Sequence, residues 1–126
     1  MVVSEKDAIW RAENNIIWLK LNQGLLYDHI DVNRIFQTFS KFEVGVNNKA
    51  LLMIDASTGC TMTKEARDLS EELAKDFFYA IAAIGDTPAA HWLVNFLNAF
   101  HYFGIPLKLF PTEETAFRWI NKQPIR

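Results

Sequence analysis

Short runs of apolar residues alternate along the chain with segments of helical periodicity. The apolar runs predict five strands, at about residues 9–12, 16–21, 50–54, 78–84 and 105–110. Apolar residues recur every three or four positions between them, which predicts helices at about 31–42, 63–77, 88–103 and 111–120. Nearly continuous apolar strands that alternate with helices are typical of a parallel sheet covered on both faces.

The resulting order of elements is β-β-α-β-α-β-α-β-α. Residues 13–15, Glu-Asn-Asn, tolerate a positive φ and are expected to form the turn of an N-terminal hairpin, which adds one antiparallel edge. We therefore expect a single α/β domain over residues 1–126, with a five-stranded, mostly parallel sheet. No repeat or low-complexity tract divides the chain.

Three residues have the side chains that favour helix starts. Asp31 is expected to cap the first helix, Thr63 the second, and Thr87 the third, with Pro88 at its first helical position. The last helix is expected to bury Ala116, Phe117 and Ile120, with Trp119 beside them.

Composition limits the classes of protein to consider. Half of the residues are hydrophobic and 22% are charged, and the net charge is −2, which gives no basic footprint for nucleic acid. No apolar run is long enough to span a bilayer, and the N-terminus lacks the features of a signal peptide. The single cysteine cannot form an internal disulfide, so a cytoplasmic protein is expected.

A loop rich in hydroxyl groups follows the central apolar run. It contains Asp55, Ser57, Thr58 and Thr61 and ends at Thr63, directly before a predicted helix. A loop at the carboxyl end of a buried strand is a common ligand position, and a helix start favours negative charge. These residues are therefore candidates for binding a partner or an anion, and Thr63 is a candidate phosphoacceptor. The structural alternative is that Thr63 caps the helix and the others satisfy their own backbone.

No constellation of residues supports an enzyme. Six residues separate Cys60 from Arg67, where the phosphate loop of a cysteine phosphatase needs five, and the extra residue rotates the arginine by about 100°. The histidines at 29, 91 and 101 lack metal-ligand spacing, and no catalytic triad or carboxylate pair is evident. We therefore expect a non-enzymatic protein with no metal and no cofactor.

The predicted helix at 88–103 is apolar over roughly 220°, about twice the stripe that a surface helix needs. Leu93, Val94 and Leu97 lie on the part that the sheet does not require. A neighbouring helix, a second copy of the chain in a homodimer, or an apolar ligand could cover this face.

The chain resembles the anti-sigma-factor-antagonist (STAS) superfamily, and more closely the small stand-alone bacterial STAS/SEC14-like proteins. The resemblance spans about residues 7–122 and depends on the order and spacing of four segments: LLMID at 51–55, KEAR at 64–67, AIAAI at 80–84 and FPTEETAFRWI at 110–120. In well-known members, a phosphorylated serine preceded by an aspartate stands at the helix start. The matching place here is Met62-Thr63, with no acid before the hydroxyl.

The resemblance implies a STAS-like domain that regulates or binds a protein partner and has no catalytic residue. We expect the recognition surface at the loop 55–63 and the following helix. The alternative is that the protein binds or carries a small apolar, lipid-like ligand in a cavity beside the helix at 88–103.

Overall fold

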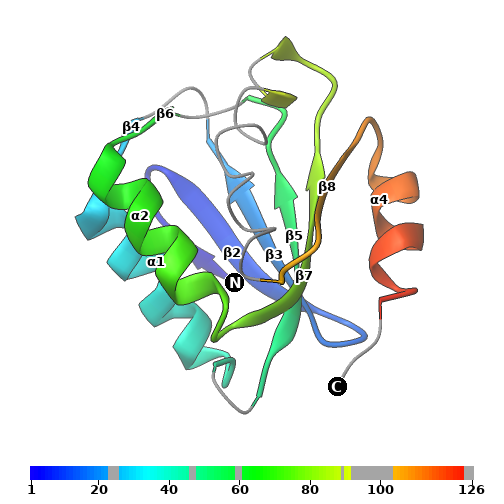
Figure 1. Ribbon diagram of the computed structural model, residues 1–126, viewed down its shortest axis with the longest axis horizontal. Coiled ribbons are helices and arrows are strands. Elements are labelled where there is room, and N and C mark those ends of the chain that lie inside the picture. The colour runs from blue at the N-terminus through cyan, green and yellow to red at the C-terminus, as the bar shows by residue number, and fades with distance from the viewer. Residues whose placement is uncertain (23–25, 46–47, 59–60, 89, 92–103, 124–126) are drawn as a thin grey trace.

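The computed structural model describes residues 1–22, 26–45, 48–58, 61–88, 90–91 and 104–123. Its centre is a six-stranded sheet in the order β1-β2-β3-β5-β7-β8 (Figure 1). These strands are β1 (Val2–Val3), β2 (Asp7–Ala12), β3 (Ile16–Leu21), β5 (Ala50–Asp55), β7 (Phe78–Ile84) and β8 (Leu107–Phe110). β5 lies between β3 and β7 and is parallel to both, so the predicted central strand is confirmed.

The N-terminal hairpin forms because its turn residues accept a left-handed backbone. Asn14 and Asn15 have φ values of 62° and 60°, and asparagine tolerates this region better than most residues. The turn sets a register in which Trp10 lies opposite Trp18. Their rings stack with centroids 5.6 Å apart. The predicted hairpin and its turn are therefore confirmed.

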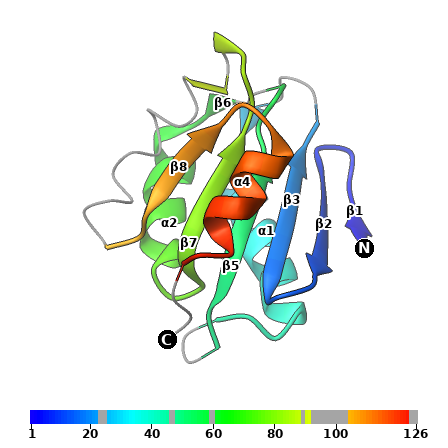
Figure 2. The ribbon, with the colours of Figure 1, turned by 90° about the vertical axis from the view of Figure 1, so that its right-hand side faces the viewer.

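Helices cover both faces of the sheet. α1 (His29–Lys41) and α2 (Lys64–Ala74) pack on one face, and α4 (Glu113–Ile120) packs on the other (Figures 1 and 2). The α1–α2 face has an aromatic centre in which the rings of Phe39 and Phe78 meet edge to face at 5.0 Å. The α4 face buries Ala116 and Ile120 against the sheet. These layers are the mixed α/β arrangement that the pattern predicted.

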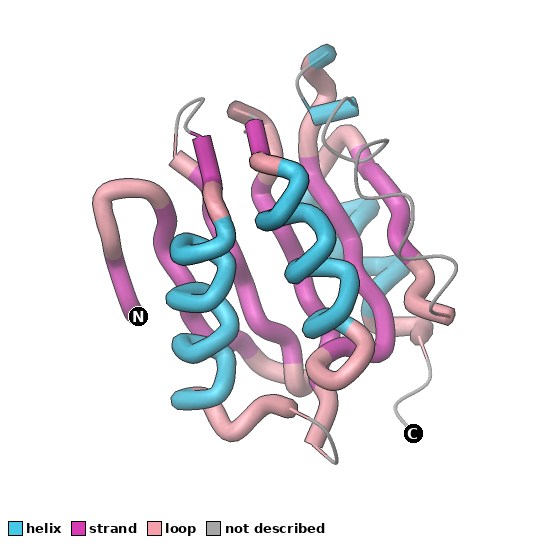
Figure 3. The backbone as a smooth tube through the Cα atoms, turned by 60° about the vertical axis from the view of Figure 1, so that its left-hand side comes forward, coloured by secondary structure: helices cyan, strands magenta, loops and turns pink. Residues whose placement is uncertain are grey.

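Short strands add an element that the periodicity did not indicate. β4 (Leu26–Tyr27) and β6 (Thr61–Met62) pair in parallel as a separate two-stranded sheet, and β1 extends the main sheet to six strands instead of the expected five. Each of these strands has two residues, too few for an alternating pattern to be recognised. Figure 3 shows β4 and β6 directly before α1 and α2, which lie side by side.

Three expectations about the helices and the last strand are wrong in detail. The N-cap of α1 is Asp28, three residues before the expected one, and Asp31 completes a capping box by accepting the Asp28 N–H. Phe117 is 40% exposed because it lies on the flank of α4 and not on the side facing the sheet. The last strand begins at Leu107 and not at residue 105.

The predicted caps of the other helices are correct where the structure describes them. Thr63 accepts a backbone N–H group at the start of α2, and Thr112, which was not among the predicted caps, does the same at the start of α4. The Thr87 side chain accepts the Ala90 N–H at 3.1 Å, and helical backbone begins at Pro88. Most of the predicted helix at 88–103, including Leu93, Val94 and Leu97, lies outside the described residues.

Replacement of Gly85 by alanine is expected to destabilise the fold. A Cβ at this position would lie 2.5 Å from the Cβ of the fully buried Ala90, so the segments after β7 must shift, at a cost of about 1–3 kcal/mol. Urea denaturation measures the change. Gly104→Ala is the control, because a Cβ there meets no atom within 4 Å and only its φ of +75° adds strain, about 1 kcal/mol. Equal stability of Gly85→Ala and the parent would contradict the close approach.

Candidate functional site

The loop after β5 lies at the edge of the sheet where β3, β5 and β7 all end, because these strands are parallel. Asp55 terminates β5, and its Oδ1 accepts the Ser57 N–H at 3.1 Å and the Ser57 hydroxyl at 2.7 Å. This is a local turn in which a carboxylate orders the following backbone. Asp55 and Ser57 thus order the local backbone, as the structural interpretation of this loop predicts.

Hydrogen bonds connect this loop to the loops that follow the neighbouring strands. The Thr58 hydroxyl lies 3.2 Å from the Leu21 carbonyl oxygen at the end of β3 and donates to it. The Thr87 hydroxyl, after β7, donates to the Ser57 carbonyl at 3.1 Å. Three strand ends are therefore fixed relative to one another, while the side chains of Ser57 and Thr58 remain exposed.

The start of α2 combines a cap with a link to β4. The Thr63 hydroxyl oxygen accepts the Ala66 N–H at 3.1 Å, and the Thr63 N–H donates to the Tyr27 carbonyl at 3.0 Å. Thr61 is exposed and pairs with Leu26 through β6 and β4, so this part of the expected loop is a short strand. The first helical residues, Lys64 and Glu65, are exposed, and the helix start faces solvent as expected.

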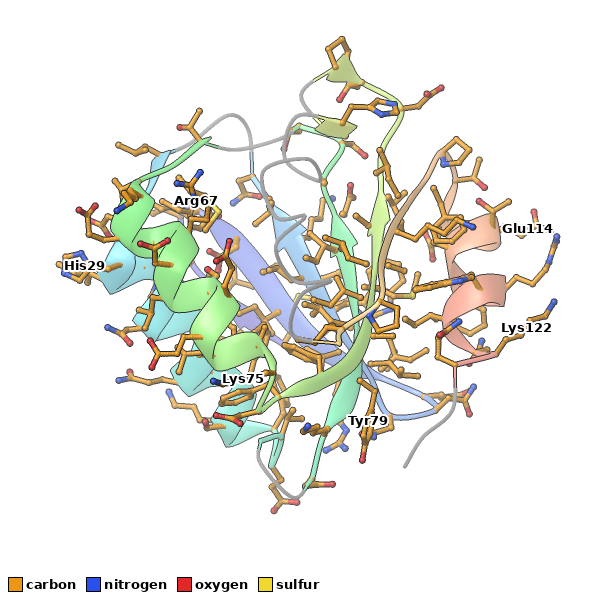
Figure 4. All side chains as sticks on the ribbon, in the orientation of Figure 1. His29, Arg67, Lys75, Tyr79, Glu114 and Lys122 are labelled. Atoms are coloured by element: carbon orange, nitrogen blue, oxygen red, sulfur yellow. The ribbon has the colours of Figure 1, made fainter. Side chains whose placement is uncertain are left out.

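Two exposed apolar side chains stand next to this region. Leu26 in β4 is 55% exposed and Ile30 in the first turn of α1 is 65% exposed. His29 lies between them in the sequence and points away from the sheet (Figure 4). Because β4 pairs with β6, Leu26 lies beside Thr61, and Ile30 follows four residues later in the first turn of α1. We call the described residues of the loop 55–63, the first turn of α2 and the Leu26/Ile30 pair the recognition surface.

Beneath β4 lies a buried ionic network that the sequence did not indicate. Asp7 is 1% exposed, and Arg34 donates to both of its carboxylate oxygens, at 3.0 and 2.8 Å. The Ser4 hydroxyl donates to Asp7 at 3.1 Å, and the single proton of the Tyr27 hydroxyl is shared between Asp7 at 3.1 Å and the Lys6 carbonyl at 2.7 Å. The residues that meet here lie up to 30 positions apart, so they form no local sequence motif. The only signal is that Asp7 shares the core-facing side of β2 with the buried Ile9.

A second ion pair joins the network at its solvent side. The Lys6 Nζ donates to Asp31 Oδ2 at 2.7 Å and to the Leu26 carbonyl at 2.8 Å. Burial alone would raise the pKa of Asp31, but hydrogen bonds from Lys6 and from the Asp28 backbone outweigh it and hold that pKa below its usual value. The pair therefore contributes stability that is present at neutral pH and is lost as the pH falls through the lowered pKa.

In the described part of the chain, two other groups have shifted pKa values. The hydrogen bond to Asp7 raises the pKa of Arg34 against the opposing effect of burial, which keeps this guanidinium charged. On α2, burial and the neighbouring Asp68 raise the pKa of Glu71.

A cavity of about 80 Å³ lies between α1, α2 and the sheet. Its described lining is apolar apart from the hydroxyls of Tyr27 and Ser70, which donate to the carbonyls of Lys6 and Ala66. Ligand pockets for small organic molecules usually enclose about 300–1,000 Å³, so this space is too small for a lipid chain. The cavity predicted beside residues 88–103 falls mostly outside the described residues.

Within the described ranges, no group of three His, Cys, Asp or Glu side chains gathers as a metal site requires. In the same residues, no helix is both long and apolar enough to cross a bilayer. Of the predicted site residues, the structure brings Asp55, Ser57, Thr58, Thr61 and Thr63 to one edge of the sheet, as expected. Cys60 lies outside the described part of the chain.

Comparison with known proteins assigns the chain to a family. A family profile described as a domain of unknown function, DUF7793, matches residues 9–123, which is most of the sequence. The chain belongs to the DUF7793 family. No curated protein matches it.

The DUF7793 domain is also similar to a solved structure from Shewanella loihica PV-4. That protein is described as an uncharacterized member of the DUF3478 family with a SpoIIAA-like fold. The two chains are 16% identical with a TM-score of 0.65, and the match covers 95% of this chain and 98% of the other. The fold is therefore SpoIIAA-like, which confirms the expected STAS-like fold.

Replacement of Arg34 by methionine is expected to destabilise the domain by about 3 kcal/mol. The change keeps the length of the side chain but leaves the carboxylate of Asp7 buried without its cation. This loss of stability is at the low end of the range for a buried ion pair because the Arg34 side chain is about one-third exposed. Denaturant unfolding gives the change, and Arg118→Met, which breaks a fully solvated pair with Glu114, is the control. If both variants lowered the free energy of unfolding by a similarly small amount, the Asp7–Arg34 pair would not have the stabilising role assigned to it.

Proposed function

We propose that this SpoIIAA-like domain is a non-enzymatic protein-interaction module that binds its partner through the recognition surface. The observation that carries this proposal is the position of the exposed Leu26/Ile30 pair beside the loop 55–63 and the open start of α2. An apolar pair bordered by polar groups is a common composition for the centre of a protein interface.

The hydrogen bonding of the loop supports binding over catalysis. The hydroxyls of Ser57 and Thr58 donate to Asp55 and to a backbone carbonyl, and that of Thr63 accepts the cap hydrogen bond. These hydrogen bonds hold the loop in one conformation. A loop held in this way is pre-organised, which lowers the entropy lost on association.

The charges around the recognition surface favour a protein over a free anion as the partner. Lys64 lies within 4.0 Å of Asp68 on α2, and Glu65 stands in the first turn of the same helix. The acidic groups offset the attraction that the helix start and Lys64 offer to an anion. Apolar contact, and not charge, then selects the partner.

The double variant Leu26→Ser/Ile30→Ser is expected to reduce partner binding about tenfold or more, because two exposed anchors lose their apolar contact. Stability should change little, since both side chains already face solvent. Quantitative affinity capture from an extract of the source cells compares the proteins retained by each form. Val3→Ser is the matched control, because Val3 is 68% exposed and lies on β1. Identical retention by the parent and the double variant would refute the proposed surface.

Thr63→Glu tests whether a negative charge at the start of α2 regulates binding. The glutamate replaces the cap hydroxyl, which costs up to about 1 kcal/mol, and its charge is favoured by the helix dipole. We expect the amount of retained partner to change, while the melting temperature falls by no more than the loss of one helix cap explains. Thr61→Glu is the control, since Thr61 is exposed nearby but caps no helix. Equal effects of the two variants would argue against Thr63 as a regulatory position.

A further inference from the structure

The segment of residues 4–7, which we call the N-terminal strap, contacts the recognition surface from the side of the sheet. Lys6 donates to the Leu26 carbonyl and to Asp31, so one ammonium group touches both β4 and the first turn of α1. At the next residue, Asp7 accepts hydrogen bonds from Arg34 of α1 and from Tyr27 of β4. The side chains of Lys6 and Asp7 thus both connect β4 to α1.

The elements that the strap contacts are short or begin at this end of the molecule. Within the described residues, β4 has two residues and pairs with the equally short β6. Tyr27 of β4 and Val32 in the first turn of α1 are 2% and 3% exposed, so apolar burial holds part of each element. The exposed Leu26 and Ile30 precede these two residues, and the strap adds polar contacts beside them.

We infer that Lys6 and Arg34 are positioning residues of the recognition surface: with Asp31 and Asp7 they form an ionic latch that holds β4 and the first turn of α1. The inference depends on the proposed function for the importance of this surface, but not for the latch itself. Other titratable or charged groups near the latch are Glu5 of the strap and Asp28, the N-cap of α1. Tyr27 and Ser4 face it with hydroxyl groups.

The outer pair of the latch is the part that can be weakened without unfolding the domain. Lys6 and Asp31 have side chains that are 35% and 14% exposed, whereas removal of Arg34 leaves a buried charge. Asp31→Asn keeps a side-chain oxygen for the Asp28 N–H, so the capping box survives while the charge is lost. Lys6→Gln removes the cation and keeps a polar side chain.

Amide hydrogen exchange measured by NMR tests the latch at two backbone reporters, and the rates are compared as protection factors because residue 31 directly precedes Val32. The Val32 N–H bonds to the Asp28 carbonyl and the Thr63 N–H bonds to the Tyr27 carbonyl. In Lys6→Gln/Asp31→Asn we expect exchange at both reporters to accelerate about fivefold or more, with no change at Leu52 of β5 or Ala82 of β7. Sodium chloride at about 1 M should accelerate the reporters in the parent but not in the double variant.

Arg118→Gln is the matched control, because it breaks a 3.0 Å ion pair on α4 that is remote from the strap. It should leave both reporters unchanged. Unchanged exchange at Val32 and Thr63 in the double variant would overturn the latch. An equal acceleration at Leu52 and Ala82 would also overturn it, because the pair would then stabilise the whole domain. Either result leaves the Leu26→Ser/Ile30→Ser capture experiment free to support or refute the proposed function separately.

Discussion

The parallel alignment of β3, β5 and β7 is the constraint on which the rest of the structure depends. Parallel neighbours need long crossover connections. In the chain, α1 lies in the connection from β3 to β5 and α2 in the connection from β5 to β7. The same alignment brings the ends of all three strands to one edge. The hydrogen bonds of Thr58 and Thr87 across that edge follow from it. The recognition surface is thus a consequence of strand direction as much as of any single residue.

Local features of the fold were predictable because their causes are local. The run at 50–54 is apolar on both faces, as a central strand requires, and Asn14 and Asn15 favour the turn they occupy. Thr63 caps α2 with its own hydroxyl, within three residues of its partner. The position of the loop 55–63 followed from the same reasoning, since a loop after a central parallel strand must lie at the strand ends.

The features that sequence reasoning missed depend on contacts between distant residues. The cap of α1 is an exception, because Asp28 and Asp31 both have a side chain suited to a cap and the helix begins after the first of them. β4 and β6 become strands because the crossovers bring them together, not because of their composition. The network around Asp7 joins residues from β2, β4 and α1, and a single charged residue at a strand start is not distinctive.

The buried carboxylate of Asp7 also restricts how the first hairpin can pair. Side chains on a strand alternate between faces, so a shift of β2 by one residue would move Asp7 to the opposite face of the sheet, away from Arg34. The same shift would remove the fully buried Ile9 from the core on the α1–α2 face. The Asp7–Arg34 pair and the apolar contacts therefore favour the same strand alignment. The charge inside the domain reinforces the pairing that hydrophobicity also selects.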